Sequence, residues 1–352
     1  MLYRAVNPHG GDLYSRPVAL DFSANTNPLG VPDTVRRAVE DSTNRLSQYP
    51  DPYCRALVRA IAAFEQTPEE TILCGCGAAE LIYSYCMAAS PRCALELAPT
   101  FSEYSAALQA AGCTVDRYLL PEENGFALDA RFLQVLEAGT WDTLMLCNPN
   151  NPTGRLADPD LLEHVARLCH EKGIRLFVDE CFLDLTDAGS GQSMKRHLRR
   201  FPGLFILKAF TKSYGMAGLR LGYCLSGDSQ LLAAMSRAVQ PWNVCGPAQD
   251  AGVAALKETG FLQRARELIR EERAWLTERL KALGLRPNPS SANYLLFYSP
   301  RPLGEALLEK GLLIRDCANY HGLGAGWYRI AVKKHKENEV LISALADILG
   351  ER

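Results

Sequence analysis

The sequence has little net charge, no long hydrophobic run and only six histidines. Its 38 Lys and Arg residues nearly balance its 40 Asp and Glu residues, giving a net charge of -2, so nothing favours nucleic acid or an anionic membrane as a partner. No apolar run approaches the ~20 residues that span a bilayer. Residues 1–10 lack the apolar core of a secretory signal. These absences predict a cytoplasmic protein of ordinary globular composition.

The twelve cysteines do not have the spacing of a metal site. Cys74 and Cys76 form a C-x-C pair, but neither a second pair nor a histidine cluster lies at zinc spacing. Most of the others lie inside apolar runs, where a free cysteine behaves as a small buried hydrophobe. We therefore expect no metal, and reduced thiols as in the cytoplasm.

Short apolar strands alternate with helical stretches through the first two thirds of the chain. This alternation predicts an α/β fold with a mostly parallel seven-stranded sheet that is covered on both faces. The strands are predicted at Thr71–Cys74, Ala94–Leu97, Thr114–Tyr118, Thr143–Cys147, Arg175–Val178, Leu204–Leu207 and Gly222–Leu225.

The alternation of strands and helices ends after Ser226, where predicted helices are followed by short strands. A chain of 352 residues is too long for one simple core, so we predict an N-terminal segment (1–30) packing near the active site, a large domain (31–235) and a small α+β domain (236–352). The small domain is expected to contain a charged helix at Phe261–Leu280 and a final helix at Glu337–Leu349. Its strands are predicted at Ala292–Tyr298, Leu312–Arg315 and Trp327–Val332.

One lysine follows a predicted buried strand directly. The run Leu204–Leu207 leads into a polar turn that contains Thr211 and Lys212. A lysine in this position can lose part of its hydration, which lowers its pKa and makes the neutral amine available for a Schiff base. Taken alone, the segment also fits an ordinary solvated loop lysine.

Other polar and flat side chains follow the neighbouring strands. In open α/β sheets, ligands bind outside the carboxyl ends of the strands. The residues that follow the strands are the glycine turn Gly75–Glu80, Phe101, the amide-rich turn Asn148–Gly154, Asp179, Lys212 and Arg220. The glycine turn suits a phosphate or a plain connection, and Phe101 suits a stacked ligand or the core. Asp179 ends a buried strand and is expected to have a cationic partner. Pyridoxal phosphate (PLP) would use the whole set, whereas a dinucleotide would need a G-x-G-x-x-G motif that is not evident.

Three motifs resemble those of the fold-type I PLP enzymes, the aspartate-aminotransferase-like superfamily. They are Asn148-Pro-Asn-Asn-Pro-Thr-Gly154, Val178-Asp-Glu180, and Thr211-Lys212 with Gly218-Leu-Arg-Leu-Gly222. The resemblance implies that Lys212 is the Schiff-base lysine, Asp179 the partner of the pyridinium nitrogen and Asn151 the donor to the phenolic oxygen. It also implies a stacking role for Phe101, phosphate binding by Gly77, Ala78, Ala79, Thr211 and Arg220, and a homodimer in which Tyr49 reaches the neighbouring subunit's cofactor.

Within that superfamily the chain is similar to the histidinol-phosphate aminotransferase branch, and more closely to the threonine-phosphate decarboxylase family of cobalamin biosynthesis. That family converts O-phospho-L-threonine to (R)-1-amino-2-propanol O-phosphate for the cobalamin nucleotide loop. Substrate-binding residues implied by position are His9, Gly10, Asn25, Asn151, Arg315 and Arg329, with Arg329 forking onto the carboxylate. The similar segments are His9–Gly11, Asp21–Gly30, Pro241–Val244, Ala292–Leu296, Leu313–Tyr320 and Tyr328–Val332.

Two residues depart from the pattern of the aminotransferases. Phe182 stands where histidinol-phosphate aminotransferases usually have Tyr, which removes a hydrogen bond to the cofactor oxygen and fits the decarboxylase family. Ala209 stands where relatives usually have Ser or Thr. The missing hydroxyl contact to the cofactor phosphate should cost only ~1 kcal/mol, so we expect weaker PLP retention at most.

Three alternatives remain open from the sequence. The first is an aminotransferase on the same scaffold, because the sequence does not determine which Cα bond faces the cofactor ring. The second is a PLP-fold protein that binds or regulates without catalysis, which the intact set of Lys212, Asp179, Asn151 and Arg220 disfavours. The third is a decarboxylase that prefers O-phospho-L-serine, since one methyl group changes discrimination by only ~1–3 kcal/mol.

Overall fold

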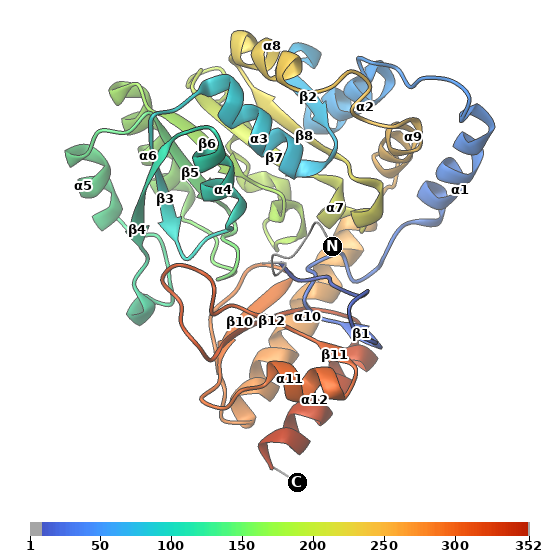
Figure 1. Ribbon diagram of the computed structural model, residues 1–352, viewed down its shortest axis with the longest axis vertical. Helices are drawn as coiled ribbons and strands as arrows, with labels where there is room; N and C mark the ends of the chain where they lie inside the picture. Colours follow the sequence, from blue (N-terminus) through green and yellow to red (C-terminus); the bar gives the residue numbers. More distant parts are fainter. Residues whose placement is uncertain (1–8, 351–352) are drawn as a thin grey trace.

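The computed structural model describes residues 9–350 and contains the predicted seven-stranded sheet in its upper part (Figure 1). The strand order is β2-β8-β7-β6-β5-β3-β4, and only β8 runs antiparallel to its neighbours. The mostly parallel sheet is therefore confirmed. Its strands are β2 (Ile72–Gly75), β3 (Cys93–Ala98), β4 (Thr114–Leu119), β5 (Thr143–Cys147), β6 (Arg175–Asp179), β7 (Leu204–Ala209) and β8 (Gly222–Ser226).

Helices cover both faces of this sheet, as continuous apolar strands require. One face packs against α3, α4 and α8, and the opposite face packs against α2, α5, α6 and α9. Because successive strand side chains point to opposite faces, Phe205 and Leu207 contact the first set, while Leu204 and Ile206 contact the second. The helices are α1 (Asp33–Ser42), α2 (Arg55–Glu65), α3 (Gly77–Ala89), α4 (Glu103–Ala110), α5 (Arg131–Ala138), α6 (Pro159–Lys172), α7 (Phe210–Ser213), α8 (Ser229–Ala238) and α9 (Gly246–Ala255).

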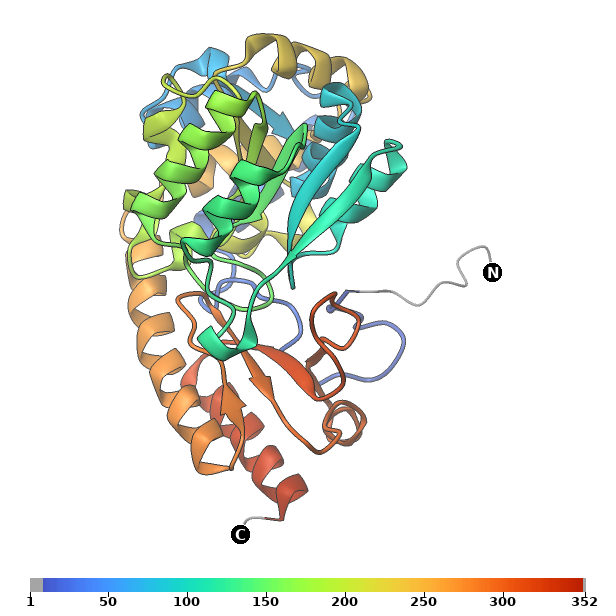
Figure 2. The ribbon, with the colours of Figure 1, turned by 90° about the vertical axis from the view of Figure 1, so that its left-hand side faces the viewer.

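The lower part of the molecule contains a small antiparallel sheet with the order β12-β13-β10-β9. Its strands are β9 (Arg286–Pro287), β10 (Tyr294–Tyr298), β12 (Arg315–Asp316) and β13 (Trp327–Ala331), and its helices are α10 (Phe261–Ala282), α11 (Gly304–Glu309) and α12 (His335–Leu349). The predicted strand Leu312–Arg315 is divided between two sheets, β12 here and β11 (Leu312–Leu313) in a separate pair. Figure 2 shows the long helix α10 running along both parts.

The N-terminal segment joins the two parts near the predicted site. β1 (Leu20–Asp21) pairs in parallel with β11, and the N–H of Phe22 donates to the carbonyl of Leu313 at 2.7 Å. Further along, the N–H of Asn27 donates to the carbonyl of Lys212 at 3.1 Å. The segment therefore runs from the lower part to the turn that contains Lys212. The domain division at residues 30 and 235 stays a prediction.

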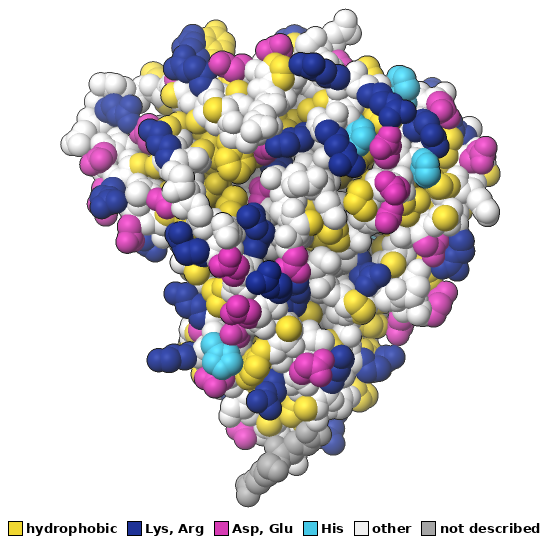
Figure 3. All heavy atoms as spheres, turned by 180° about the vertical axis from the view of Figure 1, so that it is seen from behind, with side chains coloured by type: hydrophobic (Ala, Val, Ile, Leu, Met, Phe, Trp, Pro, Cys, Tyr) yellow, Lys and Arg dark blue, Asp and Glu magenta, His cyan; other side chains and the backbone are white. Residues whose placement is uncertain are grey.

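The surface carries charges of both signs. On the face drawn in Figure 3, Lys and Arg side chains alternate with Asp and Glu side chains, without a large area of one sign. No helix within residues 9–350 is both long and apolar enough to cross a bilayer.

Candidate active site

A cavity of about 230 Å³ lies at the carboxyl ends of β5, β6 and β7. The N-terminal segment and the small sheet complete its wall. It collects thirteen of the residues singled out from the sequence: His9, Gly10, Asn25, Ala78, Ala79, Phe101, Asn151, Asp179, Thr211, Lys212, Arg220, Arg315 and Arg329. The two departures, Phe182 and Ala209, also line it. Gly77 lies just behind the wall, and Tyr49 lies elsewhere.

Lys212 lies in the short helix α7, immediately after β7. Its burial, together with the positive charge of Arg329, lowers the pKa of the amine to about 8. The ammonium nitrogen lies 5.4 Å from the centre of the Phe182 ring. The neutral, nucleophilic form of Lys212 is therefore accessible close to neutral pH.

Asp179 is the last residue of β6 and is 6% exposed. One carboxylate oxygen accepts from the Tyr104 hydroxyl at 2.6 Å, and the other accepts from the Cys181 N–H at 2.9 Å. Burial raises the pKa of Asp179, against these hydrogen bonds and the charge of Lys212. No Lys or Arg nitrogen in residues 9–350 lies within 4 Å of this carboxylate, so a cationic partner from the cofactor, its pyridinium nitrogen, stays a prediction. Among the described residues, Tyr104 and a backbone amide satisfy the buried carboxylate.

The start of α3 and Arg220 form a concave group of donors. Gly77 has φ +81°, and a Cβ built on it would lie 2.6 Å from Nη2 of Arg220. Since the first amides of a helix have no acceptor within the helix, the backbone of Ala78 and Ala79 presents free N–H groups to the cavity. Amides at a helix N-terminus together with a guanidinium form a fitting site for a phosphate.

Arg329 reaches the same cavity from β13 and is 6% exposed. It donates through Nη1 to Oδ1 of Asn151 and through Nη2 to the carbonyl of Ser23 at 2.9 Å. Because the Asn151 oxygen is occupied, its Nδ2 is left as a donor. Nε of Arg329 and Oδ1 of Asn25 are buried without a hydrogen-bond partner among the described residues, so both can bind a ligand that enters the cavity.

His9 and Arg315 lie on the outer part of the cavity wall. Nε2 of His9 lies 2.7 Å from Oε1 of Glu103, and its ring lies 5.7 Å from the ring of Phe101. Arg315 donates to Oδ1 of Asn319 at 2.6 Å. Both side chains already contact protein atoms at the place where the sequence predicts substrate contacts.

Tyr49 does not reach the cavity of its own chain. Its side chain is 79% exposed and stacks on Trp242 with ring centroids 4.4 Å apart. Both rings line a separate hollow between residues 42–56 and 240–253. Any contact between Tyr49 and a cofactor therefore needs the cavity of another chain.

The groups in the cavity fit PLP. Asp179 can pair with a protonated pyridine nitrogen, Asn151 can donate to the phenolic oxygen, and Lys212 can hold the aldehyde carbon. The α3 amides and Arg220 suit the phosphate, and Phe101 lies at the cavity wall as a flat surface. Each group that the cofactor requires therefore has a residue of suitable chemistry.

Comparison with known proteins agrees with this chemistry. The model of the family described as aminotransferase class I and II matches residues 17–345. The chain belongs to this family.

Three family relatives show how far the likeness extends. The threonine-phosphate decarboxylase of Salmonella typhimurium is 38% identical over 97% of this chain and 96% of its own. The solved histidinol-phosphate aminotransferase from Clostridium acetobutylicum has a TM-score of 0.88 and 28% identity over 95% of this chain and 100% of its own. A solved decarboxylase from Sulfurospirillum multivorans has a TM-score of 0.84 and 26% identity over 99% of this chain and 95% of its own. Pyridoxal phosphate is the cofactor of this family.

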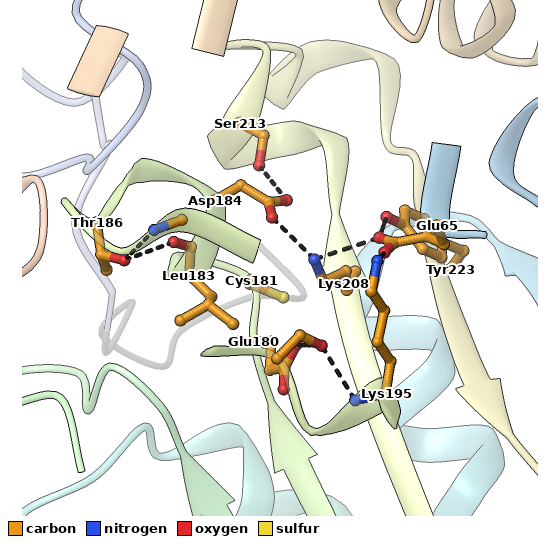
Figure 4. A network of polar contacts seen from close by, with 12 residues as sticks. Glu65, Glu180, Cys181, Leu183, Asp184, Thr186, Lys195, Lys208, Ser213 and Tyr223 are labelled. Atoms are coloured by element: carbon orange, nitrogen blue, oxygen red, sulfur yellow. Dashed lines mark hydrogen bonds and ion pairs between the residues drawn. The ribbon is translucent and has the colours of Figure 1, made fainter. Parts of the chain in front are cut away.

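Behind this family site lies a buried cluster of charges that the sequence did not reveal (Figure 4). Nζ of Lys208, on β7, lies 2.9 Å from Oδ1 of Asp184 and 3.2 Å from Oε1 of Glu65, and Lys208 is 1% exposed. Glu65 also accepts from Lys195 and from the Tyr223 hydroxyl at 2.7 and 2.5 Å. The one sequence signal was a lysine directly after an apolar run. The Lys208 cluster comprises Glu65, Glu180, Asp184, Lys195 and Lys208.

Proposed function

We propose that this protein uses PLP to decarboxylate O-phospho-L-threonine to (R)-1-amino-2-propanol O-phosphate, the amine of the cobalamin nucleotide loop. The observation that carries the proposal is the presence of three arginines in the lining of one cavity, Arg220, Arg315 and Arg329. Arg220 suits the cofactor phosphate, which leaves two guanidinium groups for the substrate. A substrate with one carboxylate and one phosphate matches that pair. The 38% identity to the Salmonella decarboxylase supports the same substrate.

Arg329 binds the substrate carboxylate and orients it. Its Nε is unpaired among the described residues and its plane is held by Asn151 and Ser23, so it can offer a fork of donors without rearrangement. Arg315, His9, Gly10 and Asn25 surround the substrate phosphate. These contacts hold the substrate at both ends, which fixes the Cα bond that is to be broken.

The bond between Cα and the carboxylate breaks, and CO2 leaves. When bound, PLP supplies an aldehyde that condenses with amines and a pyridine ring that takes up electrons from the broken bond. Asp179 holds a proton at the ring nitrogen. Lys212 then donates a proton from Nζ to Cα, which a pKa of about 8 permits near neutrality. The products are CO2 and the phosphorylated amino alcohol.

A homodimer would place Tyr49 at a cofactor. We propose that the hollow lined by Tyr49 and Trp242 meets a second copy of this chain, whose cavity receives Tyr49 at the cofactor phosphate. Support comes from the exposure of Tyr49 and its distance from its own cavity. The twelve cysteines are free, and we propose the reducing cytoplasm as the compartment.

Product analysis tests the proposed reaction. The PLP-loaded protein is mixed with O-phospho-L-threonine, with O-phospho-L-serine, or with histidinol phosphate plus a keto acid. We expect CO2 and aminopropanol phosphate from the first substrate, without need of a keto acid. Amino-group transfer from histidinol phosphate, with no release of CO2, would replace the proposal by the aminotransferase that the Clostridium structure suggests. Faster CO2 release from phosphoserine would change the substrate and retain the reaction.

A further inference from the structure

Asp184 contacts the polypeptide on both sides of Lys212. It lies in the 3-10 turn Leu183–Leu185, five residues after Asp179. Its Oδ1 accepts from Lys208 at 2.9 Å, and its Oδ2 accepts from the Ser213 hydroxyl at 3.3 Å. Lys208 precedes Lys212 by four residues, and Ser213 follows it directly. One carboxylate therefore bridges the two ends of the turn that contains the amine.

The opposite side of the turn is held by the N-terminal segment. Nδ2 of Asn27 donates to the carbonyl of Ser213 at 2.8 Å, and the N–H of Asn27 donates to the carbonyl of Lys212 at 3.1 Å. The side chain of Lys212 thus leaves a backbone that is fixed from both sides. In Figure 4, the Asp184 carboxylate lies between the Ser213 hydroxyl and the Lys208 amine.

We propose that Asp184 is the positioning residue for Lys212, acting through Ser213 and Lys208 to fix where the amine points. This inference rests on Lys212 being the reactive amine of the proposed function. The groups around Asp184 are Lys208, the hydroxyls of Tyr214 and Tyr223, and Arg266 on α10, which donates to the Asp184 carbonyl at 3.2 Å. Of these four, Lys208 donates to the carboxylate itself, so the bridge consists of this contact and the hydrogen bond from the Ser213 hydroxyl.

Loss of the bridge should alter the ionisation of Lys212. The groups that face its amine are Arg329 and Arg220, which lower its pKa, and Cys181 and Asp179, which raise it; burial is the largest influence and lowers it. If the turn loosens, the amine gains hydration and the pKa rises from about 8 towards the ordinary lysine value. A cluster that merely stabilises the fold would leave this pKa unchanged.

The test compares Ser213→Ala with Ser226→Ala. Ser226 is a matched control because it is also a buried serine, and its hydroxyl bonds the carbonyl of Leu204 at the far end of β7. In the full-length chain stripped of PLP, the pH dependence of Lys212 acetylation by acetic anhydride is followed by mass spectrometry. The exposed Lys257 serves as the internal reference. We expect a raised midpoint in Ser213→Ala, no change in Ser226→Ala, and recovery in Ser213→Thr.

The loaded enzyme provides the second readout. Because a small misplacement of a reacting group lowers the rate of the chemical step, kcat should fall about tenfold in Ser213→Ala while KM stays unchanged. Asp184→Asn should act in the same direction and more strongly. If that variant fails to fold, the Ser213 series still decides. A wild-type midpoint and a wild-type kcat in Ser213→Ala would overturn the inference, even if Lys212→Ala is inactive. An active Lys212→Ala would instead overturn the proposed function.

Discussion

Two lysines four residues apart have opposite ionisation properties. Burial alone would lower the pKa of Lys208, but Asp184, Glu65 and Glu180 outweigh it and raise that pKa well above the ordinary value. Lys212 is also shielded from water, and Arg329 exerts the strongest charge effect on it, so its pKa falls to about 8. A lysine side chain is therefore a permanent cation at Lys208, behind the sheet edge, and a titratable amine at Lys212, in the cavity.

The comparison shows that burial does not by itself make a lysine reactive. What distinguishes the two sites is the sign of the surrounding charge. Carboxylates fix Lys208 in its charged form, where it holds α2, β7 and the Asp184 turn together. Arginines destabilise the charged form of Lys212. The structural ion pair therefore lies on β7, and the reactive amine lies on the helix α7 that follows it directly.

Removing the reactive lysine should have the largest effect. Lys212→Ala should lower CO2 release from O-phospho-L-threonine by at least about 10²- to 10⁴-fold, because the proton donor at Cα is lost. PLP should still bind in part through the α3 amides and Arg220. Lys257→Ala, at an exposed position, should match the wild type. Wild-type turnover in Lys212→Ala would contradict the assignment of the reactive amine.

Removing the structural lysine should affect stability instead. Lys208→Met leaves the carboxylates of Asp184 and Glu65 buried beside an apolar side chain, and breaking a buried pair in this way costs about 3–5 kcal/mol. Urea unfolding measures the loss. Lys212→Ala should not share it, since no carboxylate among the described residues forms an ion pair with that amine. Equal unfolding midpoints for the two variants would remove the contrast between the two lysines.

Changing the positive charge next to Lys212 should move its pKa. Arg329→Gln removes a cation that lowers the pKa of Lys212, so the acetylation midpoint should rise. The same variant loses charged hydrogen bonds to the substrate carboxylate, worth about 1.5–3 kcal/mol, and kcat/KM should fall by roughly ten- to a hundredfold. Arg301→Gln, at an exposed arginine outside the cavity, is the control and should leave both readouts unchanged.

A smaller effect is expected from Glu180 in the Lys208 cluster. Burial raises the pKa of Glu180 from 4.5 to about 7, so between these values the folded state binds more protons than the unfolded state. The free energy of unfolding from this group therefore falls as pH rises through that window. Glu180→Gln lacks this loss and should gain roughly 2–3 kcal/mol in free energy of unfolding relative to the wild type as the pH rises from about 5 to about 8. Urea unfolding of both proteins at several pH values measures this difference. If the difference in free energy of unfolding between Glu180→Gln and the wild type stays constant across this range, the pKa assignment is refuted.

Sequence reasoning located the sheet because most of its strands are apolar runs that alternate with helical stretches. It missed β1 and β9, which have two residues each and no periodicity to detect. It ended the strand at Leu207, because a lysine normally closes an apolar run; β7 continues to Ala209. The contacts with Asp184 and with Glu65, on a distant helix, make a buried lysine possible there. Similarly, no local pattern could identify Tyr104 as the partner of Asp179, because the two are 75 residues apart.

The bond between Arg329 and the Ser23 carbonyl joins residues 306 positions apart. β1 pairs with β11 at a similar separation, and the N–H of Ala331 donates to the carbonyl of Phe22 at 2.8 Å. During synthesis, the large sheet can form on the ribosome while β13 is still untranslated. The substrate side of the cavity cannot form at that stage, because it includes Arg329 on β13. Cofactor capture through Lys212 and the α3 amides can therefore begin before substrate recognition, which requires β13 to be in place.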